Sequence, residues 1–222
     1  MTSTPRIEPF VRHHRRYDEW FVRHGPAYVS ELLAVRALLP WEGRGLEIGV
    51  GTGRFAGPLG VMFGIDPACK TLDYATARGI SAAGAVAEAL PFPAGVFDYA
   101  LVVTTICFVD NARNMLGEIA RVLRPGGKLV IGFIDRDSAL GQGYVAHREE
   151  NVFYRSATFY SAAEVEALLK ETGFRRLVWV QTLSRPLSEV LHIEPISTGA
   201  GRGAFLVVRA QTPGEADARP NA

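Results

Sequence analysis

Three glycines at alternate positions, Gly49, Gly51 and Gly53, follow directly on a short apolar segment at 46–48. Because glycine has no Cβ atom, such a run lets the backbone turn sharply and come close to a ligand. A plain tight turn between a strand and a helix would explain the same run. A dinucleotide-binding fingerprint would place its third glycine one position later, where the chain has Arg54. The run therefore predicts a strand, a turn and a helix, but it does not by itself specify a ligand.

Two carboxylates flank this glycine run. Glu47 stands just before it, where a negative charge would repel phosphates and favour a ligand with a cationic end. Asp66 follows the apolar segment 61–65, and an acid at a strand end can accept hydrogen bonds from both hydroxyls of a ribose. Asp66 could also cap the next helix, with Pro67 at its first position. Together the acids and the glycines predict a site for a nucleoside that carries an amino acid.

Short apolar segments alternate with helical patterns through much of the chain. The expected strands lie at 46–48, 61–65, 80–86, 99–103, 128–134, 176–181 and 204–208. The expected helices lie at 28–39, 112–123 and 162–172. They are bounded by Pro40, by Asp110 as an N-cap, and by a capping box of Ser161 and Glu164 with Gly173 after the last turn. This alternation predicts an α/β fold with a mostly parallel sheet and helices on both faces.

Composition excludes several classes of protein. With 222 residues, and ~150 residues per domain as a guide, one well-filled α/β domain is expected. A net charge of +1 gives no reason to expect a nucleic-acid partner. No apolar run reaches the ~20 residues of a membrane span, and the N-terminus has no secretion signal. The two cysteines lack metal-site spacing, so no metal is expected. Together these features predict a cytoplasmic protein that does not bind a membrane.

In their order and spacing, four segments resemble the class I S-adenosylmethionine-dependent methyltransferases, and within them the type 11 methyltransferase domain family. The segments are LEIGVGTGRFAGPLG, GIDPA, AEALPFPAGVFDYALVVTTICFVD and EIARVLRPGGKLVIGF, and they span roughly residues 45–135. The resemblance implies a Rossmann-like, doubly wound, seven-stranded sheet, with S-adenosyl-L-methionine as cofactor and S-adenosyl-L-homocysteine as its product. We divide the chain into an N-terminal helical cap at 1–44, a methyltransferase domain at 45–210 with an acceptor-side insertion at 135–160, and a flexible tail at 211–222.

The resemblance implies cofactor contacts for Tyr17, Glu47, Gly49, Gly51, Asp66, Ala87, Glu88 and Thr104. Glu47 would reach the ammonium of the methionine part, directly or through water, and Asp66 would hold the ribose hydroxyls. The backbone of Ala87, beside Glu88, would meet the adenine edge. Thr104 would line the amino-acid end of the cofactor.

One position departs from the family pattern. Family members commonly carry an acid for the adenine amino group just before the alanine of this loop, where the chain has Val86. Either Glu88 takes the place of that acid, or the amino group is left to backbone and water. Tyr17, from the cap, would close over the cofactor.

The acceptor pocket is expected from segments outside the sheet. Its aromatic candidates are Phe10, Tyr17, Trp20, Phe21, Tyr144, Phe153, Tyr154, Phe159 and Tyr160. Plain packing would also explain these rings. His147 is the best-placed candidate for a general base, although a solvated surface histidine explains it as well. Cys107, past the fourth expected strand, is interpreted as a small buried residue and not as a nucleophile.

Three functions fit these observations. The favoured one is methyl transfer from S-adenosylmethionine to a small-molecule acceptor, by in-line displacement at a donor that is already activated. A non-catalytic module that binds the same cofactor is the second, because no base is evident. A nicotinamide-dependent oxidoreductase is the third, and Arg54 and Glu47 argue against it. The sequence does not specify the acceptor, the methylated atom or the oligomeric state.

Overall fold

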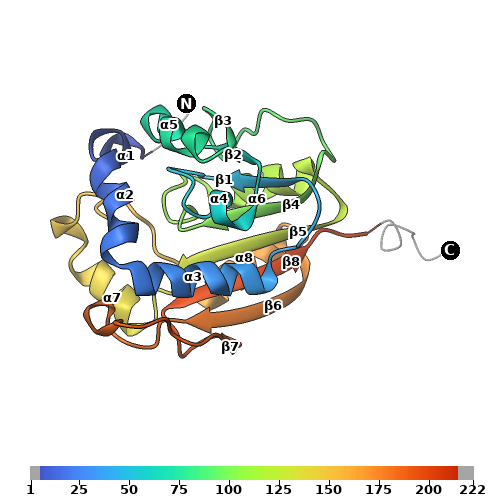
Figure 1. Cartoon of the computed structure of the whole chain (residues 1–222). Coiled ribbons are helices and arrows are strands. Elements are labelled where there is room, and N and C mark those ends of the chain that lie inside the picture. Colours follow the sequence, from blue (N-terminus) through green and yellow to red (C-terminus); the bar gives the residue numbers. More distant parts are fainter. Residues whose placement is uncertain (1–5, 215–222) are drawn as a thin grey trace.

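The computed structural model describes residues 6–214, which form one eight-stranded sheet flanked by helices (Figure 1). The strands lie in the order β3-β2-β1-β4-β5-β8-β6-β7. Neighbours from β3 to β5 pair in parallel, and β8 runs antiparallel to both β5 and β6. The predicted doubly wound, mostly parallel sheet is therefore confirmed.

The strand boundaries follow the apolar segments closely. The strands are β1 (Gly45–Ile48), β2 (Phe63–Ile65), β3 (Ser81–Ala83), β4 (Phe97–Val103), β5 (Leu123–Ile134), β6 (Arg175–Thr182), β7 (Ser197–Thr198) and β8 (Phe205–Gln211). The sequence predicted seven of them. The eighth, β7, is a two-residue edge strand that pairs antiparallel with β6, and so short a segment leaves no periodic signal in the sequence.

Helices cover both faces of this sheet. The α-helices are α1 (Glu8–Arg12), α2 (His14–Arg23), α3 (Gly25–Leu38), α4 (Ala56–Leu59), α5 (Cys69–Ala77), α6 (Ala112–Val122), α7 (Ala139–Ala146) and α8 (Ala162–Glu171). Two 3-10 turns, η1 (Arg148–Glu150) and η2 (Leu187–Glu189), complete the set. Figure 1 shows α3 crossing one face of the sheet, with α6 and α8 behind it. The end towards which β5 points is surrounded by α2 and α7.

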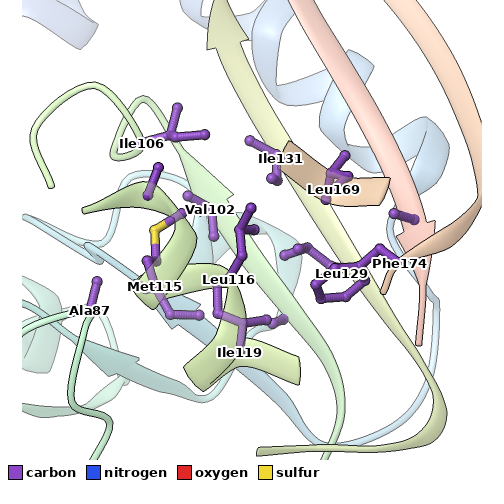
Figure 2. Packing of buried hydrophobic residues seen from close by; sticks show 14 of the residues in the cluster. Ala87, Val102, Ile106, Met115, Leu116, Ile119, Leu129, Ile131, Leu169 and Phe174 are labelled. Carbon is purple, nitrogen blue, oxygen red and sulfur yellow. The ribbon is translucent and has the colours of Figure 1, made fainter. Parts of the chain in front are cut away.

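The core follows from the alternation of side chains along the central strands. In β4, Ala100 and Val102 face one layer, whereas Leu101 and Val103 face the other. Figure 2 shows the first layer, in which Met115, Leu116 and Ile119 of α6 meet Val102 of β4, Leu129 and Ile131 of β5, and Leu169 of α8. The second layer joins the sheet to α3. Because both faces are buried, β4 reads as a continuous apolar run.

The start of α6 corrects one prediction. The N-cap is Asn111, whose Oδ1 accepts a hydrogen bond from the backbone N–H of Asn114 at 3.0 Å, and not Asp110. The backbone N–H groups of Asp110 and Asn111 instead donate to Glu88 Oε1, at 2.8 and 3.1 Å. Two adjacent residues that both favour N-caps cannot be ranked from the sequence alone.

Asn111→Ala is expected to destabilise the protein by ~1 kcal/mol, because the N–H of Asn114 loses its acceptor. Asp110→Ala is the matched control, since its side chain does not cap the helix. Urea unfolding of both variants would measure the difference. A larger loss for Asp110→Ala than for Asn111→Ala would contradict the assignment.

Two further boundaries can be compared with the sequence. The capping box of Ser161 and Glu164 at α8 is confirmed. The fold extends past the domain boundary expected at 210, because Gln211 ends β8 and Thr212 Oγ1 donates to the carbonyl oxygen of Arg124 at 2.9 Å. The rest of the predicted tail, 215–222, lies outside the described residues. Among residues 6–214, no helix is long and apolar enough to cross a bilayer.

Candidate functional site

The turn after β1 takes the conformation that its glycines allow. Gly49, Gly51 and Gly53 have φ values of 73°, 49° and 80°, in the left-handed region that favours glycine. A Cβ at Gly49 would collide with the side chain of Thr105 in the loop after β4. Gly49 therefore sets how closely the ends of two neighbouring strands approach.

Asp66 ties this turn to the end of β2. Its Oδ2 accepts a hydrogen bond from the backbone N–H of Gly51 at 2.9 Å, and its Oδ1 accepts one from the N–H of Ala68 at 2.8 Å. Burial raises the pKa of this carboxyl, and these two hydrogen bonds oppose the rise. Asp66 thus shapes the turn, holds the entry to α5 and still lines the cavity beside it.

A cavity of about 80 Å³, called here the loop cavity, lies where these strand ends meet. Seven residues of the sequence-predicted cofactor set line it: Tyr17, Gly49, Gly51, Asp66, Ala87, Glu88 and Thr104. Val86 and Thr105 line it as well, and Arg6, Ile7 and Phe10 do so from the N-terminal side. The fold thus brings together residues from five separate segments of the chain.

Glu47 is the predicted residue that does not line the loop cavity. It lies in β1 below the turn, only 2% exposed, and its Oε2 has no hydrogen-bond partner within the described part of the chain. Burial raises the pKa of Glu47 well above its usual range; the Ala56 N–H opposes this, and the charge of Asp66 adds to it. An unpartnered buried carboxylate lacks a cation or a donor, and an ammonium group would supply both.

The part of the loop cavity where the adenine edge is expected is partly apolar, as Val86 in the sequence predicts. Val86 and Ala87 line the loop cavity beside Glu88. Glu88 Oε1 already accepts hydrogen bonds from the two backbone N–H groups at the start of α6, at 2.8 and 3.1 Å. Its second carboxylate oxygen is left for a ligand. No sequence motif indicated this double task, because the partners lie more than 20 residues away.

An ion pair fixes Tyr17 over the turn. Its neighbour Asp18 accepts hydrogen bonds from Arg54, with Oδ1 to Nε at 2.9 Å and Oδ2 to Nη2 at 2.6 Å, and Arg78 reaches Oδ2 at 3.1 Å. This bidentate pair joins α2 to the segment directly after the glycines. As a result the Tyr17 ring lies over Gly51, where a Cβ would meet it at 3.4 Å.

A second cavity, of about 320 Å³, is called here the aromatic cavity. Phe10, Tyr17, Thr104 and Phe108 line both cavities, so the two are adjacent. All nine aromatic candidates for the acceptor pocket line the aromatic cavity: Phe10, Tyr17, Trp20, Phe21, Tyr144, Phe153, Tyr154, Phe159 and Tyr160. Many of the rings pack edge to face, as Tyr17 and Phe21 do with centroids 5.4 Å apart.

The two remaining polar candidates differ in position. His147 lines neither of the two cavities: it is exposed at the end of α7, its Nδ1 lies 3.0 Å from the carbonyl oxygen of Gly143, and it lines a groove that shares Tyr144 and Tyr154 with the aromatic cavity. Cys107 lines the aromatic cavity, where its Sγ donates to the carbonyl oxygen of Thr104 and burial raises its pKa to about 12. A thiol with that pKa is not a thiolate at neutral pH, which argues against a nucleophile, but the side chain is half-buried and not fully buried as the sequence interpretation expected.

Among the residues of the aromatic cavity that sequence reasoning missed, Glu31 is the buried carboxylate. It lies on α3 and is 4% exposed. Its helix presents an apolar stripe, and nothing in that pattern distinguishes an inward-facing glutamate from a solvated one. Within residues 6–214, no three His, Cys, Asp or Glu side chains gather in a metal-binding arrangement.

Comparison with known proteins agrees with this geometry. Residues 46–131 match the family model of the type 11 methyltransferase domain. A crystal structure from Thermotoga maritima has 46% identity and a TM-score of 0.89, covering 91% of this chain and 97% of that one. The chain belongs to the class I methyltransferases of the type 11 domain family. The Thermotoga protein is described as a SAM-dependent methyltransferase and possible histamine N-methyltransferase.

Two curated relatives extend the comparison. An uncharacterized protein of Methanocaldococcus jannaschii is 41% identical to this methyltransferase, over 91% of this chain and 98% of that protein. An O-methyltransferase of Aspergillus sclerotiorum is 32% identical, over 68% of this chain and 63% of its own length. The names of the relatives thus include both nitrogen and oxygen as methylated atoms.

Proposed function

We propose that this methyltransferase moves a methyl group from S-adenosylmethionine to a small-molecule acceptor that binds in the aromatic cavity. The observation that carries the proposal is the adjacency of the two cavities at the carboxyl ends of β1, β2 and β4. Ligands of open α/β sheets bind at that end. The proposal also agrees with the description of the Thermotoga relative, which names the same cofactor.

The residues present fit this cofactor. The unpartnered carboxylate oxygen of Glu47 suits the ammonium of the methionine part, and Asp66 suits the ribose hydroxyls. The apolar pair Val86 and Ala87 would flank the adenine ring, with the second oxygen of Glu88 facing its edge. When bound, the cofactor supplies an electrophilic methyl group, whose bond to sulfur breaks with the electron pair left on sulfur.

The chain itself contributes alignment and exclusion of water. Phe10, Tyr17, Thr104 and Phe108 separate the two cavities and so determine how an acceptor approaches the cofactor. Alignment of two reactants can supply ~7–11 kcal/mol of the barrier reduction. The bidentate pair between Asp18 and Arg54 keeps Tyr17 in place for that task.

Calorimetry with three ligands tests the proposal. We expect S-adenosylmethionine and S-adenosylhomocysteine to bind the purified chain, and NADH not to bind. Incubation with a radiolabelled methyl donor and a panel of amines, phenols and thiols would then measure turnover. Binding of NADH alone would favour the oxidoreductase, and cofactor binding without turnover on any acceptor would favour the non-catalytic module.

Asp66→Ala is expected to weaken binding of S-adenosylhomocysteine by ~1–3 kcal/mol, because the ribose hydroxyls lose a charged acceptor. Asp73→Ala, at an exposed position of the nearby helix α5, is the matched control. The dissociation constants from calorimetry give the comparison, with circular dichroism to check the fold. Equal affinities for Asp66→Ala and the wild type would refute the ribose assignment.

A further inference from the structure

Glu31 is a buried carboxylate that the proposed cofactor site does not use. It lies in the middle of α3 and lines the aromatic cavity, with 4% of its surface exposed. Within residues 6–214 it forms no hydrogen bond and no ion pair. Its neighbours on the same helix differ in this respect, since Ser30 donates to the carbonyl oxygen of Pro26 at 2.7 Å. Burying an ionised carboxylate costs a large desolvation free energy unless a positive charge lies beside it.

The surroundings of Glu31 are aromatic. The rings that share its cavity include those of Trp20, Phe21, Tyr144, Tyr154 and Phe159. Tyr144 and Tyr154 lie with centroids 4.8 Å apart, and Tyr154 and Phe159 at 5.5 Å. The faces of such rings attract organic cations. A negative group inside an aromatic enclosure is a pattern suited to an ammonium ligand.

The other polar groups of this cavity do not neutralise Glu31. The titratable and charged groups that line the cavity with Glu31 are Arg16, Tyr17 and Arg23 of α2, His24 directly after α2, Cys107 after β4, Tyr144 of α7, Tyr154 and Tyr160. Neither arginine pairs with Glu31: Arg23 lies 3.9 Å from Glu19, and Arg16 lies over the ring of Phe153 at 6.0 Å. The tyrosines and the thiol carry no positive charge, and burial lowers the pKa of His24, which disfavours its charged form. A cationic ligand would therefore supply the positive charge that these groups do not.

We propose that Glu31 binds the protonated amino group of the methyl acceptor, and that the acceptor is a small amine with an apolar or aromatic body. This inference rests on the proposed function and specifies the substrate class of the same site. The aromatic cavity, at about 320 Å³, has room for such a molecule beside the loop cavity. The amine then lies in the compartment that adjoins the cofactor.

Glu31 also provides an acceptor for the proton that the ammonium group must lose before methyl transfer. An ammonium nitrogen has no free electron pair, so one N–H bond must break with its pair left on nitrogen. The proton moves to a carboxylate oxygen of Glu31, and the freed pair forms the new bond to the methyl carbon. The product is a protonated N-methylamine, and Glu31 then releases its proton to solvent. Every charge and proton is accounted for by the acceptor, the carboxylate and the methyl donor.

The protonation of Glu31 in the ligand-free protein favours an amine over a phenol. Burial raises the pKa of Glu31 to about 8, so the carboxyl is mostly protonated at pH 7. A phenol brings no charge and would meet a neutral acid, which cannot take its proton. A protonated amine restores the ionised form because the two opposite charges stabilise each other.

Calorimetry on the full chain, saturated with S-adenosylhomocysteine, tests the inference. The probes are 2-phenylethylamine, tryptamine and cyclohexylmethylamine, each compared with the alcohol of the same skeleton. We expect the amines to bind more tightly than the alcohols, and Glu31→Gln to weaken amine binding ~30-fold or more, the usual minimum for removing one partner of a buried charge pair. Glu166→Gln, on the exposed surface of α8, is the control and should leave amine binding unchanged.

A second measurement needs no variant. At pH 7 a carboxyl with a pKa of about 8 holds ~0.9 proton, so amine binding should release ~0.9 proton from the wild type. Titrations in two buffers of different ionisation enthalpy measure this number, and Glu31→Gln should release none. Amines that bind no better than alcohols, or bind Glu31→Gln equally, would overturn the inference. The inference would also be overturned if S-adenosylhomocysteine bound but none of the amines in the panel did. Failure of S-adenosylhomocysteine to bind at all would instead refute the proposed function.

Discussion

Glu47→Gln is expected to weaken binding of S-adenosylmethionine ~30-fold or more, and to make the ligand-free protein more stable above pH 7. The first effect arises because the ammonium of the cofactor loses a buried counter-charge, which costs ~2–5 kcal/mol. The second arises because the Oε2 of Glu47 has no hydrogen-bond partner among the described residues, so burial destabilises the ionised form. Glutamine removes the charge and can still accept the Ala56 N–H. One substitution thus moves affinity and stability in opposite directions.

The sign of the stability effect follows from the pKa. Burial raises the pKa of Glu47 in the folded state above its unfolded value. Between the two pKa values, the folded protein therefore binds more protons than the unfolded protein. The free energy of unfolding decreases as the pH rises from the unfolded-state pKa to the folded-state pKa. Calorimetry with S-adenosylhomocysteine and urea unfolding at pH 6 and pH 8 measure both effects, with Glu166→Gln as the exposed control. Unchanged affinity together with lower stability at pH 8 would show that Glu47 serves the fold and not a ligand.

The sequence predicts the turn and its carboxylates well because the determinants are local. The positive φ values of Gly49, Gly51 and Gly53 follow from their spacing after an apolar segment. The position of Asp66 follows from the end of the next strand. Each of these needs only a strand, a turn and the parallel pairing of β1 with β2. The fold class is predicted for the same reason, since alternating strands and helices leave few topologies.

Features that depend on distant segments could not be predicted in this way. Glu31 faces the aromatic cavity only because the segments around Tyr144 and Tyr154 fold back over α3. The pair between Asp18 and Arg54 joins residues 36 positions apart, and no pattern in α2 or in the turn after β1 indicates it. His147 was the plausible base because histidine is common in that role, yet the structure places it in a neighbouring groove and not among the residues that line the two cavities. A buried group without a partner is visible only once the fold is known.

The ligand-free protein is expected to lose ~4 kcal/mol of stability between pH 5 and pH 8 through Glu31 alone. Burial raises the pKa of Glu31 from 4.5 to about 8 in the folded state. Between these values the folded state binds the proton that the unfolded state has already released. The free energy of unfolding therefore falls by ~1.4 kcal/mol per pH unit, and the contribution ends once the pH passes the folded pKa. Urea unfolding at pH 5, 6.5 and 8 measures the slope.

Glu31→Gln should remove most of this slope, because glutamine does not titrate, and the variant should be more stable than the wild type at pH 8. The slope that remains in the variant includes the contributions of Glu47 and Asp66, whose pKa values burial also raises. Addition of 2-phenylethylamine at ~100 times its dissociation constant for the wild type should restore ~2.7 kcal/mol to the wild type at pH 8, and ~0.9 kcal/mol or less to Glu31→Gln, which binds the amine ~30-fold or more weakly. An identical slope in the two proteins would mean that Glu31 does not titrate inside the cavity. Glu31 would then be ionised at neutral pH even without a ligand, and amine binding would release no proton from it.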